Sequence, residues 1–391
     1  MTRRFVLFAY GFRSFFLLAG IYAAIGMALW LWLQAKGSQP FTGVPAHLWH
    51  SHEMLYGFIG AALAGFVLTA VPSWTGSRGF AGAPLVVLVL LWLAGRLAIA
   101  FFGDLPIIVT GLAELLFLPA LVATIAPPLF RTRNRNQVVL LIIAALWVSD
   151  VVFVRALHDG NLAVASAALR AGIGIVLLLV TLIGGRIVPA FTANAVRNAG
   201  VDVSVRSRPF VEVSVFAAMV AYVLADMLVA SPFVIALVSA LAAVLHCLRL
   251  SGWHGLESRR EPIVWILHLA YLWLPVGLAM RALFVGGGVA WAGHWQHALA
   301  AGAAGTMILA VMTRASLGHT GRPLSVNTTI VVAYVALLLG VAVRVFGPAL
   351  LPTGYLVTLF TAGLLWVLAF TLFTIVYAPI LIRPRVDGKP G

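Results

Sequence analysis

Two histidines and a glutamate lie within four residues at the start of a long apolar stretch, which runs from His50 to Gly76. The stretch begins H-S-H-E, with His50, His52 and Glu53 as its polar members. Neutral imidazole is a ligand for copper, iron and zinc, and a neighbouring carboxylate can orient the ring or carry a proton. Both histidines can share one ligand sphere only if the backbone is not yet helical there, because residues i and i+2 of a helix do not face each other. The pattern predicts a metal or haem site at the entrance of this segment.

A second histidine-headed apolar stretch follows far along the chain, from His297 to Gly321. Aligned without gaps, the two stretches match a histidine and several glycines: His52 falls on His297, Gly57 on Gly302, Gly60 on Gly305 and Gly76 on Gly321. Small residues allow close packing of membrane helices, and they also leave a flat space in which a porphyrin could lie. His297 is therefore expected to complete the site of His52. His294, one turn earlier, and His47 are weaker candidate ligands.

Two more histidines are candidate ligands near the opposite membrane face. His268 lies in an apolar run, where a polar side chain needs a partner or a metal. His319 lies in the segment L-G-H-T-G-R-P, where binding of phospholipid headgroups is the alternative to ligation. The outer and inner histidines could serve one cofactor or two.

Charged residues inside the apolar segments complete the set of candidates. Three acids are expected to transfer protons, or to accept a hydrogen bond from the ring nitrogen of a ligand histidine that does not bind the metal. They are Glu53, Glu114 and Asp150. Arginines can hold haem propionates by paired hydrogen bonds, and three are candidates for this role: Arg96, Arg186 and Arg314. The alternative is that these arginines simply pair with the buried acids.

The composition is that of an all-α polytopic membrane protein. Of the 391 residues, 62% are apolar and only 9% are charged, against about 25% charged in soluble domains. Long apolar runs recur from end to end, and no polar stretch is long enough to fold a separate soluble domain. About twelve transmembrane helices are expected, roughly at residues 14–33, 53–73, 84–102, 106–126, 138–158, 166–189, 210–229, 232–250, 263–284, 297–314, 327–346 and 356–381.

The basic residues predict the orientation of these spans. The formal net charge is +14, and the arginines gather in every second loop, as the positive-inside rule requires. Both termini of this multi-pass membrane protein are therefore expected to be cytoplasmic. The same distribution accounts for the positive charge without a nucleic-acid partner.

The repeated pattern suggests an internal organisation within a single integral membrane domain, residues 1–391. Span 6 offers a weaker third copy of the histidine-headed stretch, in which Pro189 and Thr192 match Pro72 and Thr75. Three parallel four-helix repeats are therefore expected, at about 1–130, 131–255 and 256–391. Chance similarity between glycine-rich apolar helices is the alternative.

The single cysteine, Cys247, restricts the cofactor chemistry. One cysteine cannot form an intramolecular disulfide, a two-cysteine copper centre, an iron–sulfur site or a C-x-x-C-H haem attachment. Any haem must be bound non-covalently, with histidine as its axial ligand.

Four long motifs give the chain a family resemblance. W-H-S-H-E-M-L-Y-G-F, G-F-V-L-T-A-V-P-S-W-T-G, G-R-I-V-P-A-F-T-A-N-A and G-T-M-I-L-A-V-M-T-R-A-S-L-G-H-T-G-R-P-L together resemble the NnrS family over nearly the whole sequence. That family is described as twelve-span bacterial inner-membrane proteins that contain haem and copper and are linked to denitrification and nitric oxide resistance. The resemblance implies haem b and copper here. It places the family's histidines on His50, His52, His268, His297 and His319.

Several functions follow from these observations as hypotheses. The first is a haem–copper protein that binds nitric oxide and reduces it to nitrous oxide, with electrons from a periplasmic cytochrome or from a quinol in the lipid membrane. The second is a haem or copper carrier, or a nitric oxide sensor, without turnover. A secondary transporter is the third, and it is disfavoured because no matched pair of helices is broken in mid-membrane.

Overall fold

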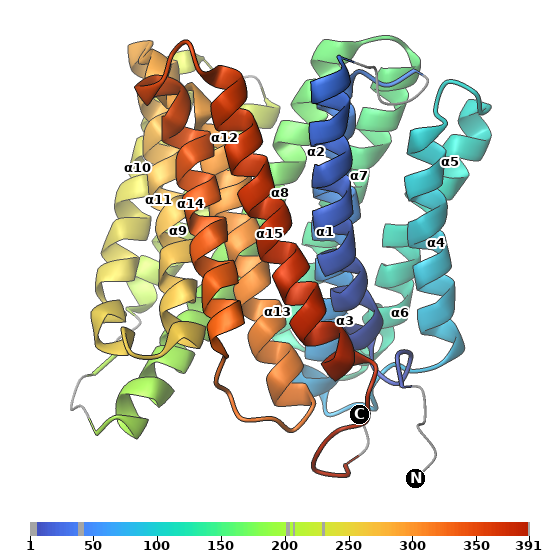
Figure 1. The fold of residues 1–391 in the computed structure, drawn as a ribbon, viewed down its shortest axis with the longest axis vertical. Helices are drawn as coiled ribbons and strands as arrows, with labels where there is room; N and C mark the ends of the chain where they lie inside the picture. The colour runs from blue at the N-terminus through green and yellow to red at the C-terminus, as the bar shows by residue number, and fades with distance from the viewer. Residues whose placement is uncertain (1–5, 38–42, 201–203, 206–207, 229–230, 390–391) are drawn as a thin grey trace. The chain divides into compact units, whose positions relative to one another are not determined.

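Helices account for nearly all of the regular structure in a computed structural model that describes residues 6–37, 43–200, 204–205, 208–228 and 231–389 (Figure 1). The α-helices in chain order are α1 (Gly11–Lys36), α2 (Ala46–His52), α3 (Gly60–Thr75), α4 (Ala83–Ala100), α5 (Ile107–Leu115), α6 (Phe117–Arg131), α7 (Val138–His158), α8 (Leu162–Asn198), α9 (Pro209–Met227), α10 (Pro232–Ser251), α11 (Pro262–Gly287), α12 (Trp295–His297), α13 (Thr306–His319), α14 (Thr328–Leu350) and α15 (Tyr355–Leu381). Short 3₁₀ segments, η2 (Arg135–Gln137), η3 (Gly255–Ser258) and η4 (Ala290–His294), lie in the connections.

Twelve of the helical segments are long and apolar enough to cross a membrane, which confirms the expected fold class. The largest difference in boundaries is at the sixth span, which was expected at 166–189 and is α8, Leu162–Asn198. Pro189 lies inside this helix and does not end it. Prolines are tolerated in transmembrane helices because neighbouring groups satisfy the freed backbone atoms.

Two of the spans contain a π-helical segment, a wider winding that often occurs at functional sites. The segment η1 covers Glu53–Ile59 between α2 and α3, and η5 covers Ala298–Gly305 between α12 and α13. Each begins directly after one of the two histidines that the sequence alignment matched, His52 and His297. The backbone thus repeats a local feature at the matched positions, while the scheme of three repeats stays a prediction.

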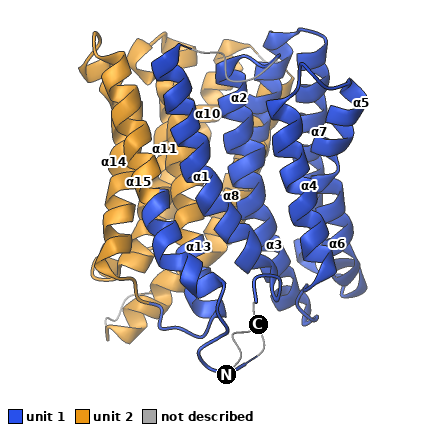
Figure 2. Ribbon diagram, turned by 45° about the vertical axis from the view of Figure 1, so that its right-hand side comes forward, with its two compact units in different colours: residues 1–172, 312–324, 370–391 blue, residues 173–311, 325–369 orange. Residues whose placement is uncertain are grey.

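The chain divides into two compact units, coloured separately in Figure 2. The first unit consists of residues 1–172, 312–324 and 370–391, and the second of residues 173–311 and 325–369. Three helices, α8, α13 and α15, contribute residues to both units. Each unit has its own buried polar groups.

In the first unit, α1 packs against α3 and η1, α3 packs against α6, and α4 packs against α5. Phe12, Phe15 and Phe16 of α1 are fully buried in this packing. Helix α4 exposes Leu90 and Leu97 on its outer side. An apolar exposed face of this kind suits contact with lipid acyl chains.

The two ends of the chain meet at one side of the first unit. The buried Arg13 donates from Nη1 to the carbonyls of Leu381 and Arg383, both at 2.8 Å, and so satisfies the end of α15. Further along, Arg385 donates to the carbonyl of His319 at 2.7 Å and pairs with Asp387 at 2.5 Å. The hydrogen bond from Arg385 holds the pKa of Asp387 well below its usual range, so this pair is ionised at neutral pH. The start of α1 and the segment that follows α15 therefore lie on one side of the first unit, and the cytoplasmic location of the termini stays a prediction.

In the second unit, α10 packs against both α9 and α11, and α11 also packs against η5. Two ion pairs join these helices. Arg249 of α10 pairs with Glu212 of α9, and Arg281 of α11 pairs with Asp226 of α9 at 2.5 Å. These arginines are not the ones considered for propionate binding, which were Arg96, Arg186 and Arg314.

Replacing Arg13 tests the closure of the chain ends. Arg13→Met keeps the apolar stem but leaves the last carbonyls of α15 without their donor, which should cost about 2 kcal/mol of stability. We expect the melting temperature of the detergent-purified protein to fall by several degrees. Arg155→Met is the control, because Arg155 is exposed and pairs only with Asp159 in the next turn. Equal melting temperatures for the two variants would contradict this prediction.

Candidate metal centre

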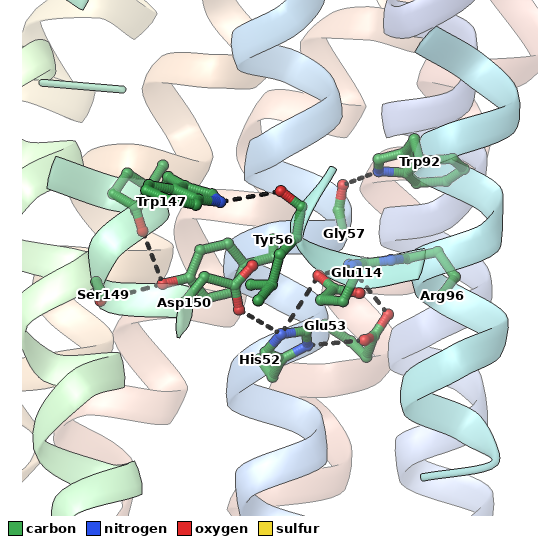
Figure 3. A network of polar contacts seen from close by, with 12 residues as sticks. His52, Glu53, Tyr56, Gly57, Trp92, Arg96, Glu114, Trp147, Ser149 and Asp150 are labelled. Carbon is green, nitrogen blue, oxygen red and sulfur yellow. Dashed lines mark hydrogen bonds and ion pairs between the residues drawn. The ribbon is translucent and has the colours of Figure 1, made fainter. Parts of the chain in front are cut away.

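His52 lies at the centre of a buried group of carboxylates in the first unit (Figure 3). Its side chain is fully buried, and both ring nitrogens face acids. Nδ1 is 2.9 Å from Oε1 of Glu53, whereas Nε2 is 3.2 Å from Oδ1 of Asp150 and 3.5 Å from Oε1 of Glu114. Four polar side chains, three of them distant from one another in the sequence, thus share one small volume inside the membrane-spanning helices.

Four elements position these side chains. His52 ends α2, and Glu53 opens the π-helical segment η1. Glu114 lies in the last turn of α5, and Asp150 lies in the middle of α7. The π-helical winding is supported from outside by Trp92, whose indole Nε1 donates to the carbonyl of Gly57 at 3.0 Å (Figure 3).

An arginine and a tyrosine hold the carboxylates in place. Arg96 of α4 forms an ion pair with Glu114, and its Nη1 lies 3.4 Å from Oε2 of Glu53. The hydroxyl of Tyr22 in α1 donates to the same oxygen of Glu53. On the other side, the ring of Phe153 stacks on His52 with centroids 4.7 Å apart. The group is therefore enclosed by aromatic rings and fixed by directional bonds.

The charges of this group do not balance without a further cation. Three carboxylates, those of Glu53, Glu114 and Asp150, lie around His52, and the guanidinium of Arg96 contacts two of them, Glu53 and Glu114. With neutral His52, two negative charges stay uncompensated in a buried place, which costs several kcal/mol per ion. A bound divalent cation would supply both positive charges, whereas a second proton on His52 would supply one and leave the other to a proton on a carboxylate.

The geometry fits a metal ion. Nε2 of His52 and one oxygen each of Glu114 and Asp150 all lie within 4.8 Å of one another, and all three residues are buried. Nitrogen and oxygen ligands bind such metals at about 2.1 Å, so adjacent ligand atoms are about 3.0 to 3.4 Å apart. The measured separations of 3.2 and 3.5 Å from Nε2 are close to that range. One imidazole and two carboxylates suit a divalent metal such as Cu²⁺, Fe²⁺ or Zn²⁺.

Glu53 has a different role from the other two acids. It accepts from Nδ1 of His52, which fixes the ring so that Nε2 points toward Asp150 and Glu114. A carboxylate behind a ligand histidine is the usual arrangement in metal sites. Carboxylate oxygens lie 3.2 and 3.5 Å from Nε2, so the space beside this nitrogen fits a small metal ion and not the wide ring of a haem.

The structure does not bring His50 or His47 into this group. Helix α2 is regular through His52, so the expectation of an irregular backbone at this entrance is wrong. Neighbouring residues of a helix point to different sides. His50 instead stacks on Trp30 with centroids 4.6 Å apart, and His47 is exposed.

The other predicted ligands lie outside the group. His319 belongs to the first unit, where its ring packs on Phe12 with centroids 5.5 Å apart. His268, His294 and His297 belong to the second unit. Nδ1 of His294 is 3.2 Å from Nη1 of Arg344, and His297 directly precedes η5. Their roles as ligands stay predictions, as do the propionate-binding roles of Arg186 and Arg314.

Aromatic side chains cover three of the glycines that follow the matched histidines. A Cβ atom at Gly302 would lie 2.6 Å from the ring of Trp273, and one at Gly305 would lie 2.8 Å from Trp366. Gly57 lies against the ring of Tyr22 in the same way. These positions therefore serve close packing within each unit, which was the alternative to an open porphyrin slot.

From the sequence, Glu114 and Asp150 were predicted to transfer protons or to support a ligand histidine. Direct binding of the metal by these two acids was not predicted. Ligands were sought among histidines, because imidazole was the stronger signal. The sequence did contain a signal for metal binding by these acids. Glu114 and Asp150 both lie in apolar helices, where a carboxylate requires a cation, and Arg96 can neutralise only one of them.

Comparison with known proteins agrees with this picture of a polytopic membrane protein. The family model for NnrS protein matches residues 6–385, nearly the whole chain. The chain belongs to the NnrS family. No curated protein sequence matches the chain closely enough to add a named relative. Membership makes this a membrane protein of a family associated with nitric oxide stress, and metal binding is consistent with the buried group around His52.

Asp150→Asn tests whether the acids bind metal. We expect the metal content of the purified protein, measured by mass spectrometry, to fall about tenfold or more, because an amide is a weaker ligand than a carboxylate. The metal-free variant should be as stable as the metal-free parent or more so, since one uncompensated charge is gone. Asp159→Asn, just beyond the end of the same helix α7, is the exposed control and should keep its metal. Full metal retention in Asp150→Asn would remove this residue from the site.

Glu53→Gln tests the orienting contact on His52. The amide still fits the space but is a weaker partner for the Nδ1 hydrogen, so the metal dissociation constant should rise about 10- to 100-fold. The measurement is competition with a chelator of known affinity. His158→Gln, an exposed histidine at the end of α7, is the matched control. An unchanged dissociation constant in Glu53→Gln would show that Glu53 does not support the metal.

Proposed function

We propose that this protein binds nitric oxide at a copper ion held by His52, Glu114 and Asp150, and that it reduces nitric oxide to nitrous oxide with the help of a haem b. The observation that carries the proposal is the buried, negatively charged ligand group inside a chain of the NnrS family. The family resemblance supports haem and copper, and the donor atoms of the group suit copper as Cu²⁺.

The surroundings of the site suit nitric oxide as the ligand. Nitric oxide is small and uncharged, so it can reach a fully buried site through lipid and apolar side chains. His52 and Glu53 are each 0% exposed, and Phe153 covers the ring of His52. An anion would meet the carboxylates here at a high electrostatic cost. A neutral gas meets no such barrier.

The residues of the site also account for the protons that the reaction consumes. Two molecules of nitric oxide, two electrons and two protons give one molecule of nitrous oxide and one of water. A metal at this site would supply an open coordination position for nitric oxide. The carboxylate oxygens of Glu114 and Asp150 that do not bind the metal can carry protons to that position, while Arg96 and Tyr22 keep the charged Glu53 in place next to His52.

The haem is assigned to a histidine outside the group around His52. We propose His297, because it directly precedes the second π-helical segment just as His52 precedes the first. The electron donor is either a periplasmic cytochrome or a quinol, and the protein is assigned to the bacterial inner membrane with cytoplasmic termini. A protein that only binds or carries the same cofactors, as a sensor or a copper carrier, is the alternative.

Anaerobic turnover is the decisive experiment for this proposal. The reduced, purified protein is given nitric oxide, and nitrous oxide is measured by gas chromatography together with haem and copper content. We expect many product molecules per protein, with a loss of about a hundredfold or more in His52→Ala because the metal would be absent. His158→Gln should keep full activity. A haem spectrum that shifts on adding nitric oxide without any product would favour the sensor or carrier.

A further inference from the structure

A separate cavity of about 790 Å³ lies in the second unit, near the end of α10 and the start of α11. The loop between these helices forms one wall, through Gly255 and Leu256, and the first turns of α11 form another, through Trp265 and His268. Its volume is in the range of sites for small organic ligands. The proposed nitric oxide site in the first unit does not use any of these residues.

His268, a residue of the cavity lining, has a hydrogen-bond acceptor without a partner among the described residues. Nε2 of His268 is 2.7 Å from Oγ1 of Thr192. The hydroxyl of Thr192 donates its own hydrogen to the carbonyl of Val188 at 2.8 Å. Nε2 therefore carries the ring hydrogen, and Nδ1 is left as the acceptor. Nδ1 lies beside Gly255 and has no hydrogen-bond partner among the described residues, although His268 is only 8% exposed.

The cavity borders on surface that suits lipid. Leu269 and Leu272 of the membrane-spanning helix α11 are both exposed, and Leu256 in the loop is 82% exposed. The charged residues of the lining, Glu257 and Arg259, belong to the loop wall and not to α11. A ligand that enters along α11 from the membrane would thus pass apolar side chains before it reaches His268.

We propose that this cavity binds the ring of a membrane-soluble quinol, whose hydroxyl donates a hydrogen bond to Nδ1 of His268. An unpaired acceptor in an apolar cavity selects for a ligand that combines a donor with an apolar ring. Phosphate and carboxylate groups of lipids are acceptors when ionised, so they do not satisfy Nδ1. The oxidised quinone has only carbonyl acceptors, so the site should prefer the reduced form.

This assignment gives His268 a different role from the ligation predicted from the sequence. A Cβ atom at Gly255 would lie 2.5 Å from Nδ1, so the backbone of the loop closely approaches this nitrogen. The remaining space suits a hydroxyl group better than the wide ring of a haem. The proposal rests on the proposed function only in naming the class of electron donor, and the binding itself can be tested without turnover.

Binding of a quinol analogue tests the proposal. The full-length protein in phosphatidylcholine nanodiscs is titrated with 2-heptyl-4-hydroxyquinoline N-oxide, whose fluorescence is quenched on binding, and the probe is then displaced with decylubiquinol. We expect saturable binding and displacement, weakened about tenfold in His268→Phe, which keeps a flat ring but removes the acceptor. Cys247→Ala, at another part of the lining, should bind as the parent does.

Two further measurements separate this role from others. The dimethyl ether of decylubiquinol cannot donate a hydrogen bond, so it should displace the probe about tenfold less well than decylubiquinol. Haem and copper content should be unchanged in His268→Phe. Absence of quenching, equal displacement by the ether, competition by phosphatidylglycerol, or loss of haem from His268→Phe would each overturn the proposal. Absence of nitrous oxide turnover with intact quinol binding would instead contradict only the proposed function.

Discussion

Negative charge buried among membrane-spanning helices governs the architecture of the first unit. Glu53, Glu114 and Asp150 come from separate elements and meet around one imidazole. In a low-dielectric interior, such charges are tolerated only with cations and hydrogen-bond donors in contact. Arg96 and Tyr22 supply part of this compensation, and the rest requires protons on the group or a metal ion at Nε2 of His52.

The helices around this group are arranged so that the compensation is possible. Helix α4 brings Arg96, α5 brings Glu114, and α7 brings Asp150 to the end of α2. The π-helical segment η1 begins at the point where His52 and Glu53 meet. Wider winding of this kind is rare, and where it occurs it is frequently found at functional sites. The second unit repeats the winding after His297.

The two units use buried polar groups in different ways. In the first, acids outnumber the arginine, which favours binding of a cation and access by a neutral gas. In the second, Arg249 and Arg281 each have an acidic partner, and the unpaired atom at the cavity is a neutral acceptor on His268. A metal site in one unit and a quinol site in the other would divide nitric oxide chemistry from electron supply within one chain.

The fold class, the number of spans and the family could all be predicted from the amino-acid sequence, because long apolar runs and extended motifs are local properties of the chain. The sequence also identified polar residues inside apolar segments, where an unpaired polar side chain is costly. Among them are His52, Glu53, Arg96, Glu114 and Asp150. Only the packed helices show that these five side chains meet and that His50 instead stacks on Trp30. The direction of a side chain depends on how each helix is wound and rotated against its neighbours, and that rotation is set by packing across the whole unit rather than by residue spacing.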